Sequence, residues 1–285
     1  MYTLSEAAEA TGVAAQTLHA WERRYGAITP QRTATDRRLY TFEDIQRLRL
    51  LKAGVGLGHR ISTLVLMENE KLQNLLADGG RETHFELLKY LRQMDFRNFE
   101  RALSAIYSTL GPTAFIKSIV VPLMVEIGDL WENGLLSITA EHIGTSMIRS
   151  YTASSLHFGN SSRPKSTGVF TTFEGELHEL GILGAAVLAQ NLEVNCIYLG
   201  PQLPANEIVE AAKHFKADFI CLGAKTISDS RMLVQIETLV SGLHEDVEIL
   251  IGGHPARNLR KWPDRCHIIP SFEDFERKIK SKHAA

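Results

Sequence analysis

One short segment brings an imidazole and carboxylates to a place where a folded chain could use them. The segment Glu174–Gly181 reads Glu-Gly-Glu-Leu-His-Glu-Leu-Gly, with an apolar, strand-like run before it and a helix-like run after it. A histidine on a tight loop at the carboxyl end of a strand can reach a ligand outside the sheet. Loop histidines are common metal ligands, and the second ring nitrogen usually needs a carboxylate or carbonyl partner. The pattern predicts His178 as a metal ligand with Glu176 as its partner. The alternative is a structural loop histidine.

An alternating pattern of strand-like and helix-like runs must position this loop. The expected strands are 168–173, 194–199, 218–223, 247–252 and 267–270, and the expected helices are 179–191, 205–215, 229–243 and 272–282. Alternating βα units predict a Rossmann-like, doubly wound parallel sheet over 164–285. Gly223, Gly252 and Gly253 fall at strand ends, where glycine lets a large flat ligand approach the backbone. No GxGxxG follows the first strand and no GxxxxGK occurs, so nucleotide binding is weakly supported.

The middle segment, 81–160, carries four helix-like patterns with short breaks, which predict a four-helix bundle. The Glu-x-x-His pattern of di-iron bundles is not repeated there, so such a site is not expected. Trp131 closes the third pattern, and Glu141 and His142 are adjacent on the fourth. This spacing could place all three near one mouth of the bundle. On spacing alone, a partly buried Trp and a surface Glu-His pair is the favoured interpretation.

The N-terminal segment, 1–72, has the pattern of a helix-turn-helix. A short helix with Thr3 as its N-cap is expected, followed by a turn at Gly12 and a second helix over 14–25. A major-groove reader contacts base edges from the start of its second helix. The candidate base-reading side chains are therefore Gln16, Thr17 and His19.

Local charge supports nucleic-acid binding. The whole chain has a formal net charge of −2, but 23–60 holds nine basic and three acidic residues, a local balance of +6. Phosphate contacts dominate protein–DNA affinity and need such a patch. The polar stretch 31–38 could form a hairpin wing. The alternative is a solvated face of a small helical domain. The basic residues are Arg23, Arg24, Arg32, Arg37, Arg38, Arg47, Arg49, Lys52 and Arg60.

Length and composition fit a multidomain cytoplasmic protein. The 285 residues are 44% hydrophobic, enough for two or three domains. Gly54–Gly58 is expected to be a turn or hinge, and Asp78–Gly80 a domain boundary. No signal peptide and no apolar run of about 18 residues is found, so no membrane span is expected. The three cysteines read as buried free thiols in a reducing compartment: Cys196, Cys221 and Cys266.

The N-terminal segment resembles the winged helix-turn-helix of MerR-type transcription regulators. The residues that carry the resemblance are Tyr2-Thr-Leu4, Trp21-Glu-Arg-Arg-Tyr-Gly26 and Arg37-Arg-Leu-Tyr-Thr-Phe-Glu-Asp-Ile45. The resemblance implies a dimer that binds double-stranded DNA at a palindromic operator. It also implies six DNA contacts by carry-over: Arg23, Arg24, Tyr25, Arg37, Arg38 and Tyr40.

The rest of the chain, 81–285, resembles a cobalamin-binding module. The motifs are Trp131-x9-Glu-His, then Glu176-x-His-x-x-Gly181, then Gly252-Gly253. Together with the MerR-type segment, they resemble the light-responsive repressors of the CarH/LitR type. That resemblance implies adenosylcobalamin, with His178 as the lower cobalt ligand and Trp131, Glu141 and His142 over the upper, adenosyl face. It further implies a homo-oligomer, a dimer or tetramer, that binds DNA in the dark and is taken apart by photolysis.

Three positions depart from the pattern of these repressors. Gly223-Ala224-Lys225 stands where Ser-x-Leu is usual, Glu132 stands where photoreceptor members often have His, and Glu176 replaces the commoner Asp. The competing interpretation is a MerR-type regulator whose module has lost corrinoid binding and serves in oligomerisation or protein interaction. A corrinoid methyl carrier is disfavoured by the DNA-binding segment. No nucleophile–base arrangement is found, so an enzyme is not expected.

Overall fold

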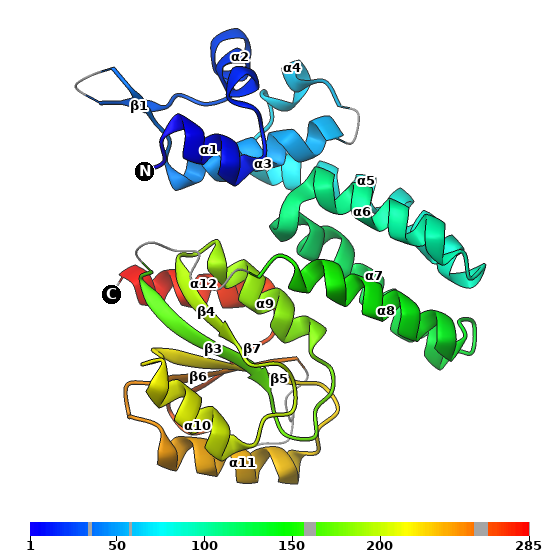
Figure 1. Cartoon of the computed structure of the whole chain (residues 1–285), viewed down its shortest axis with the longest axis vertical. Coiled ribbons are helices and arrows are strands. Elements are labelled where there is room, and N and C mark those ends of the chain that lie inside the picture. The colour runs from blue at the N-terminus through cyan, green and yellow to red at the C-terminus, as the bar shows by residue number, and fades with distance from the viewer. Residues whose placement is uncertain (34–35, 57–58, 157–163, 254–261, 285) are drawn as a thin grey trace. The chain divides into compact units, whose positions relative to one another are not determined.

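The computed structural model describes residues 1–33, 36–56, 59–156, 164–253 and 262–284, without the side chains of 73, 74 and 76–82. Contacts between the elements separate the chain into two units, Met1–Ile148 and Arg149–Ala285. The first unit contains the N-terminal domain and most of a helical bundle. The second contains a parallel sheet with helices on both faces (Figure 1). The division into 1–72, 81–160 and 164–285 remains a prediction.

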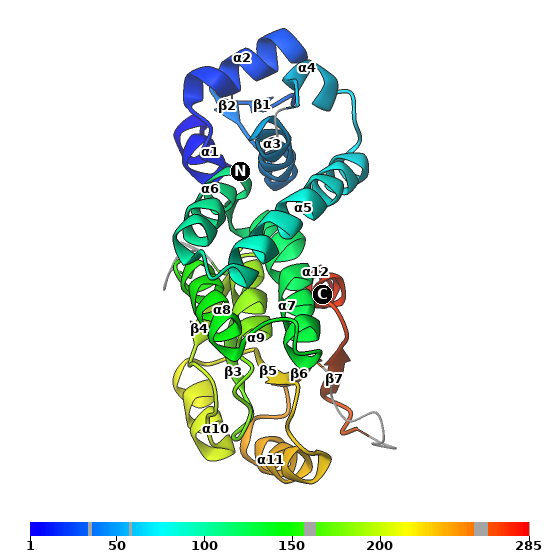
Figure 2. The ribbon, with the colours of Figure 1, turned by 90° about the vertical axis from the view of Figure 1, so that its right-hand side faces the viewer.

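The N-terminal domain is a winged helix-turn-helix, as predicted. Helices α1 (Leu4–Thr11) and α2 (Ala15–Tyr25) flank the turn, and Thr3 forms a capping box with Glu6 at the start of α1. The wing is an antiparallel pair of β1 (Gln31–Arg32) and β2 (Arg38–Leu39). Helices α1, α2 and α4 (Ile61–Leu64) surround α3 (Phe42–Gly56), as Figure 2 shows. Their shared core includes Leu18, Trp21 and Leu48.

The glycines after the predicted third helix belong to that helix. A turn or hinge at Gly54–Gly58 was expected, but α3 runs to Gly56, and Gly58 lies outside the described residues. A Cβ on Gly54 would lie 2.8 Å from Leu64 Cδ1, and one on Gly56 would lie 2.0 Å from Thr109 Cγ2. The prediction was wrong at Gly54 and Gly56 because glycine there permits close helix packing, a role that local sequence does not distinguish from a turn.

Five helical elements follow, and they build the predicted bundle. They are α5 (Asn69–Arg92), α6 (Phe96–Phe115), the π-helix η1 (Ile116–Val120), α7 (Val121–Glu132) and α8 (Ile138–Ala153). Gly111, at φ +74°, kinks α6. A domain boundary was expected at Asp78–Gly80, and the backbone there is helical because α5 continues through it. A glycine inside a helix costs about 1 kcal/mol, which strong helical flanks can offset.

The expectation that no long apolar run exists was also wrong. The helical stretch Phe96–Glu132 contains an 18-residue window with a mean hydropathy of 1.5, which meets the length and composition criteria for a membrane span. The kink at Gly111 divides this stretch. Its side chains Phe99, Leu103 and Leu123 are fully buried in the protein. Part of the apolar stretch therefore belongs to the core of the bundle, and 39% of its apolar window is buried.

The second unit is a five-stranded, wholly parallel sheet. The strands are β3 (Ser166–Thr172), β4 (Val194–Tyr198), β5 (Phe219–Ala224), β6 (Glu248–Gly253) and β7 (Cys266–Ile269), in the order β4-β3-β5-β6-β7. Helices α9 (Leu180–Gln190) and α12 (Phe272–Ala284) cover one face. Helices α10 (Ala205–His214) and α11 (Asp229–Gly242) cover the other (Figure 1). The structure confirms the predicted doubly wound sheet, with element ends displaced by at most two residues.

The cysteines are confirmed as buried and unpaired by disulfides. Burial raises the pKa of the Cys221 thiol to about 12 and that of Cys266 to about 11, and it raises the pKa of Cys196 as well. A thiol that stays protonated is a poor nucleophile and a poor metal ligand. These residues therefore act as small apolar side chains of the sheet core.

A buried histidine lies where the bundle departs from α-helical geometry. His84 on α5 is 8% exposed, and its Nε2 has no hydrogen-bond partner among the described residues. Burial lowers its pKa, and Glu126 and hydrogen bonds to the backbone of Ile119 and Ser118 in the π-helix act in the opposite direction. Since the folded pKa lies below the unfolded value of about 6.5, His84 favours folding above that pH. This contribution is lost as the pH falls toward the folded pKa.

We expect His84→Gln to make stability less dependent on pH. Between pH 8 and pH 5 the melting temperature of the wild type should fall further than that of the variant, because only the wild type must accept a proton on a buried ring. Thermal unfolding by circular dichroism at several pH values measures the difference. His244→Gln, at an exposed histidine, is the control. Parallel pH curves for wild type and His84→Gln would contradict the assignment.

Candidate functional site

The histidine loop lies at the switch point of the sheet. Strand β3 is flanked by β4 on one side and β5 on the other, and chain order reverses there. The loop Phe173–Glu179 follows β3, and 225–228 follows β5, so both loops leave the carboxyl edge side by side. Ligands of doubly wound sheets bind in the crevice at this position. The topology therefore places the predicted loop where a ligand site is expected.

Glu176 joins the two loops through a buried carboxylate. Its side chain is 0% exposed, and Oε2 accepts hydrogen bonds from the backbone N–H groups of Lys225 at 2.7 Å and Ile227 at 3.1 Å, and from Thr226 N at 2.5 Å. Oε1 accepts from the backbone N–H of His178 at 2.9 Å. Burial alone would raise the pKa of this carboxyl, but the hydrogen bonds from His178, Thr226 and Lys225 outweigh it and hold the pKa at about 2. Glu176 is therefore a carboxylate anchored from both loops.

The same carboxylate orients the imidazole. His178 Nδ1 lies 2.6 Å from Glu176 Oε1, and the Thr226 hydroxyl lies within 3.4 Å of both atoms. The ring is 48% exposed, and no hydrogen bond to Nε2 is found among the described residues. A carboxylate on one ring nitrogen fixes the ring and leaves the other nitrogen for a ligand outside the loop. The predicted pairing of Glu176 with His178 is thus present in the structure.

A glutamine on α11 holds the start of the loop. Gln235 Oε1 accepts from the Glu174 N–H at 2.9 Å, and Gln235 Nε2 donates to the Glu174 carbonyl at 3.1 Å. Gly175 follows at φ +90°, a conformation that favours glycine. Thr226 and Gln235 belong to the site, yet they were absent from the sequence prediction. Each lies about fifty or more residues from the loop, and neither forms a motif with it.

The predicted glycines have different local roles. Gly223 and Gly252 are register partners at the ends of β5 and β6. Gly181 is exposed, and a Cβ there would meet no atom within 4 Å. Gly253 has φ +101°, and a Cβ on it would lie 2.1 Å from the Ala224 carbonyl oxygen. Gly253 is therefore required by the backbone itself, whereas Gly181 leaves open space beside the histidine loop.

The departure at Gly223 has a local explanation. A Cβ there would lie 3.0 Å from Thr172 Cγ2, so Thr172 takes the space that a larger residue would need. Thr172 Oγ1 also donates to the Glu176 carbonyl at 2.6 Å and accepts from Gln202 N at 2.8 Å. Lys225 contributes its backbone N–H to Glu176, and its side chain is exposed. The residues present are compatible with an imidazole-ligated group that approaches the carboxyl edge.

The candidate residues of the bundle lie at the junction of two helices. Trp131 is in the last turn of α7 and is 46% exposed, and Glu132 after it is also exposed. Glu141 and His142 are in the first turns of α8, where Glu141 Oε2 is paired with His142 Nδ1. Glu141 Oε1 accepts from the Thr145 hydroxyl at 2.9 Å. These residues belong to the first unit, and His178 belongs to the second.

The winged domain presents part of the predicted DNA-contact set at its surface. Gln16, Arg23, Arg24 and Arg37 are exposed, and Tyr25 is 38% exposed. Thr17 and His19 are partly buried, and His19 Nε2 is enclosed without a partner among the described residues. The exposed arginines thus lie at the end of α2 and in the wing, where a winged helix-turn-helix meets phosphates.

Tyr40 is a correction to the predicted DNA contacts. It is 0% exposed, and its backbone pairs with Tyr2 in an antiparallel bridge. Its hydroxyl is enclosed without a hydrogen-bond partner among the described residues. A side chain in this position cannot meet DNA, so Tyr40 belongs to the core of the domain. Its ring packs in that core. The motif match identifies the residue type but does not distinguish a core tyrosine from one that contacts DNA.

Several arginines that were counted in the local basic balance have structural partners. Arg47 donates to the carbonyl oxygens of Ala27, Val65 and Met67, and Arg49 donates twice to that of Ala10. Burial lowers the pKa of Arg49. Arg38 Nε donates to Glu22 Oε2 at 2.7 Å. The local charge of +6 therefore overstates what DNA could meet, because Arg47 and Arg49 hold helices together.

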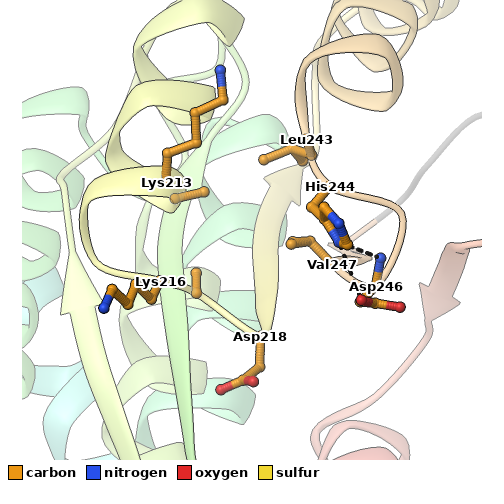
Figure 3. Close-up of a pocket in the computed structure, with 9 residues that line it drawn as sticks. Lys213, Lys216, Asp218, Leu243, His244, Asp246 and Val247 are labelled. Carbon is orange, nitrogen blue, oxygen red and sulfur yellow. Dashed lines mark hydrogen bonds and ion pairs between the residues drawn. The ribbon is translucent and has the colours of Figure 1, made fainter.

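A hollow lies at the opposite edge of the sheet from the histidine loop, near the start of β5 (Figure 3). It has a volume of about 340 Å³ and is lined by Lys213, Asp218, His244 and Asp246 among others. Several of its charged groups have local partners: His244 Nδ1 lies 3.1 Å from Asp246 Oδ2, and Asp218 Oδ2 accepts from Thr167 N. Lys213 pairs with Glu210 on the same helix. This hollow is part of the surface between α10 and α11 and is separate from the histidine loop.

Sequence comparison assigns three segments to known domain families. Residues 2–70 match the MerR HTH family of regulatory proteins, and residues 84–153 and 166–274 each match a B12-binding domain. Winged domain, helical bundle and histidine-bearing sheet thus define a DNA-binding regulator with a cobalamin-binding module.

Related proteins identify the family. The HTH-type transcriptional repressor CarH of Myxococcus xanthus is 30% identical, and the alignment covers 97% of each chain. The chain belongs to the MerR-type, B12-binding transcription regulators, the family of that repressor. The HTH-type transcriptional regulator MlrA of Escherichia coli (strain K12) is 37% identical over 32% of this chain and 37% of its own.

Corrinoid proteins are similar to part of the chain. Dimethylamine corrinoid protein 1 of Methanosarcina acetivorans is 26% identical over 55% of this chain and 75% of its own. The solved structure of the monomethylamine corrinoid protein of Methanosarcina barkeri superposes with a TM-score of 0.55 at 14% identity, covering 70% of this chain and 99% of that protein. The latter likeness is one of fold.

We expect Glu176→Ala to destabilise the ligand-free protein by about 3 kcal/mol, because several buried N–H donors would lose their acceptor. Glu176→Gln should restore only part of the loss, since its amide NH₂ would face other donors. Urea unfolding followed by circular dichroism measures both. Glu174→Ala, on the same loop but with an exposed side chain, is the matched control. Equal unfolding curves for Glu176→Ala and Glu174→Ala would refute the anchoring role.

Proposed function

We propose that this chain is a cytoplasmic repressor gated by adenosylcobalamin, with His178 as the lower cobalt ligand. The observation that carries the proposal is the Glu176–His178 pair at the switch point. One ring nitrogen is held by a carboxylate while the ring remains about half exposed. Metal-ligating histidines commonly have this second partner, which raises ligand basicity and sets ring orientation. Gly181, where a Cβ would meet no atom within 4 Å, would leave the carboxyl edge open to a flat macrocycle, and we assign Gly223, Gly252 and Gly253 to the cofactor site with it.

The bundle would supply the opposite wall. We assign Trp131, Glu141 and His142 to the upper, adenosyl face, where an aromatic ring and a paired carboxylate and imidazole can contact a nucleoside. When bound, adenosylcobalamin supplies a cobalt–carbon bond that light can break. Glu132 follows Trp131 in this chain, so no imidazole from that position would be available after illumination. The response to light and the binding of adenosylcobalamin are therefore two independent parts of the proposal.

The output would be DNA binding by an oligomer. The exposed residues Arg23, Arg24 and Arg37 carry positive charge at the end of α2 and in the wing. A dimer or tetramer would repeat this surface with the symmetry of a palindromic operator. We propose that the cofactor-loaded form assembles in the dark and binds DNA, and that photolysis takes it apart.

Cobalamin binding is tested by gel filtration. Purified protein mixed with adenosylcobalamin in the dark should elute as a coloured peak, and His178→Ala should bind less and change the cobalt absorption spectrum because a nitrogen ligand is removed. His244→Ala, at an exposed histidine away from the loop, should behave as the wild type. A colourless wild-type peak would overturn the proposal in favour of a module used for oligomerisation or protein interaction. An unchanged spectrum in His178→Ala would remove that residue as the ligand.

DNA binding is tested by charge removal. Arg23→Ala and Arg37→Ala should each weaken binding to all duplexes and reduce the slope of log affinity against log salt by about 1. Fluorescence anisotropy at several salt concentrations, with an operator selected from random duplexes, measures both effects. Arg277→Ala, an exposed arginine on α12, is the charge-matched control. Salt slopes equal to that of the control would exclude these arginines as phosphate contacts.

A further inference from the structure

The residue directly after His178 is held by partners from two other elements. The Glu179 carboxylate accepts from Arg149 Nε at 2.5 Å, from Arg149 Nη2 at 3.2 Å and from the Tyr198 hydroxyl. Arg149 lies toward the end of α8, and Tyr198 is the last residue of β4, the neighbour of β3. We call Arg149, Glu179 and Tyr198 the Glu179 clamp. All three residues belong to the second unit.

Helix capping does not explain the clamp. Glu179 occupies the N-cap position of α9, but its side chain makes no capping hydrogen bond. Ser, Thr, Asp and Asn are preferred at that position because a short side chain can reach the free backbone N–H groups. The longer Glu179 side chain is instead committed to Arg149 and Tyr198. The Glu179 side chain therefore connects the histidine loop to α8 and β4 and does not cap the end of α9.

The geometry of the clamp restricts the backbone at His178. The Glu179 side chain is only 14% exposed, and the paired guanidinium contact fixes its direction as well as its distance. Glu179 shares a peptide bond with His178, so holding its side chain limits the torsions available to His178. On the other side, Glu176 binds both the His178 N–H and its ring. His178 is thus held between two acidic residues that are both anchored.

The clamp also involves the helix that carries the proposed upper-face residues. Glu141, Thr145 and Arg149 are spaced by four residues along α8, so they lie on one face of that helix. Thr145 donates to Glu141, and Glu141 is paired with His142. The same face of one continuous helix therefore carries the His142–Glu141 pair in its first turns and the partner of Glu179 near its end.

We propose that Arg149, Glu179 and Tyr198 are positioning residues for His178 and link the histidine loop to α8. They act through the backbone of His178 and through the carboxylate of Glu179. This inference rests on the proposed cobalamin site, since it assigns the clamp the task of presenting the cobalt ligand. A change in the position of His178 would then alter the contact between Glu179 and Arg149, and through it the position of α8.

The full chain tests the clamp with Arg149→Met and Glu179→Ala. Each should weaken adenosylcobalamin binding about tenfold or more, as is typical for residues that orient a metal ligand. The bound fraction should also lose the absorption spectrum of nitrogen-ligated cobalt. Arg149→Lys should recover part of both, because it keeps the charge but loses the planar fork. Arg277→Met, which breaks an exposed ion pair on α12, should match the wild type.

A second measurement needs no cofactor. Hydrogen exchange of the ligand-free protein should be faster over 176–183 in Arg149→Met than in Arg277→Met, and equal elsewhere in the sheet. If Glu179→Ala does not fold, Tyr198→Phe removes one hydroxyl from the clamp and serves the same comparison.

The outcomes separate the two proposals. A wild type that binds cobalamin, with clamp variants identical to it in affinity, spectrum and exchange, overturns the clamp and leaves the proposed function intact. A wild type that binds no cobalamin overturns the proposed function and, with it, the clamp as a device for a cobalt ligand. Binding by the wild type, with a loosened loop and lost nitrogen ligation in the variants, supports both.

Discussion

The charge of Glu176 is the constraint on which the histidine loop depends. A carboxylate with no exposure to water is costly unless its oxygens are saturated with donors. The chain meets this demand with backbone N–H groups from the loop after β3 and the loop after β5. Those loops leave neighbouring strands only because β3 lies beside β5 at the switch point of the sheet. The ring of His178 is oriented by the same carboxylate, so the ligand geometry is a consequence of how the charge is satisfied.

Charge in the N-terminal domain is divided between two uses. Arg47 and Arg49 donate hydrogen bonds to backbone carbonyl oxygens and stabilise the packing of α3. In contrast, Arg23, Arg24 and Arg37 are exposed. Only the exposed group can contribute the salt-dependent affinity that phosphate contacts give. The chain belongs to the MerR-type, B12-binding regulators, so DNA binding is the role expected of this exposed surface. The structure, and not the net charge, identifies which arginine side chains are available to contact DNA phosphates.

Periodicity predicted regular elements well, and glycine predicted breaks poorly. The strands and helices of the sheet unit were placed to within two residues because apolar strands and amphipathic helices repeat over short distances. The turn or hinge expected at Gly54–Gly58 is helical as far as Gly56, and the backbone at the expected domain boundary Asp78–Gly80 is helical as well. Glycine serves both turns and close packing, and only the neighbour across the contact, such as Thr109 beside Gly56, decides between them.

The sequence by itself determined the local chemistry: a histidine two residues after a glutamate, on a loop between a strand and a helix, within a fold of alternating elements. These features depend on neighbours along the chain, where spacing dictates proximity. The tertiary structure alone decided which distant groups complete the loop. Thr226 reaches it from the loop before α11 and Gln235 from α11 itself, and Arg149 and Tyr198 reach Glu179 from α8 and β4. Strand order brings these groups together, and no local pattern in the chain records that order.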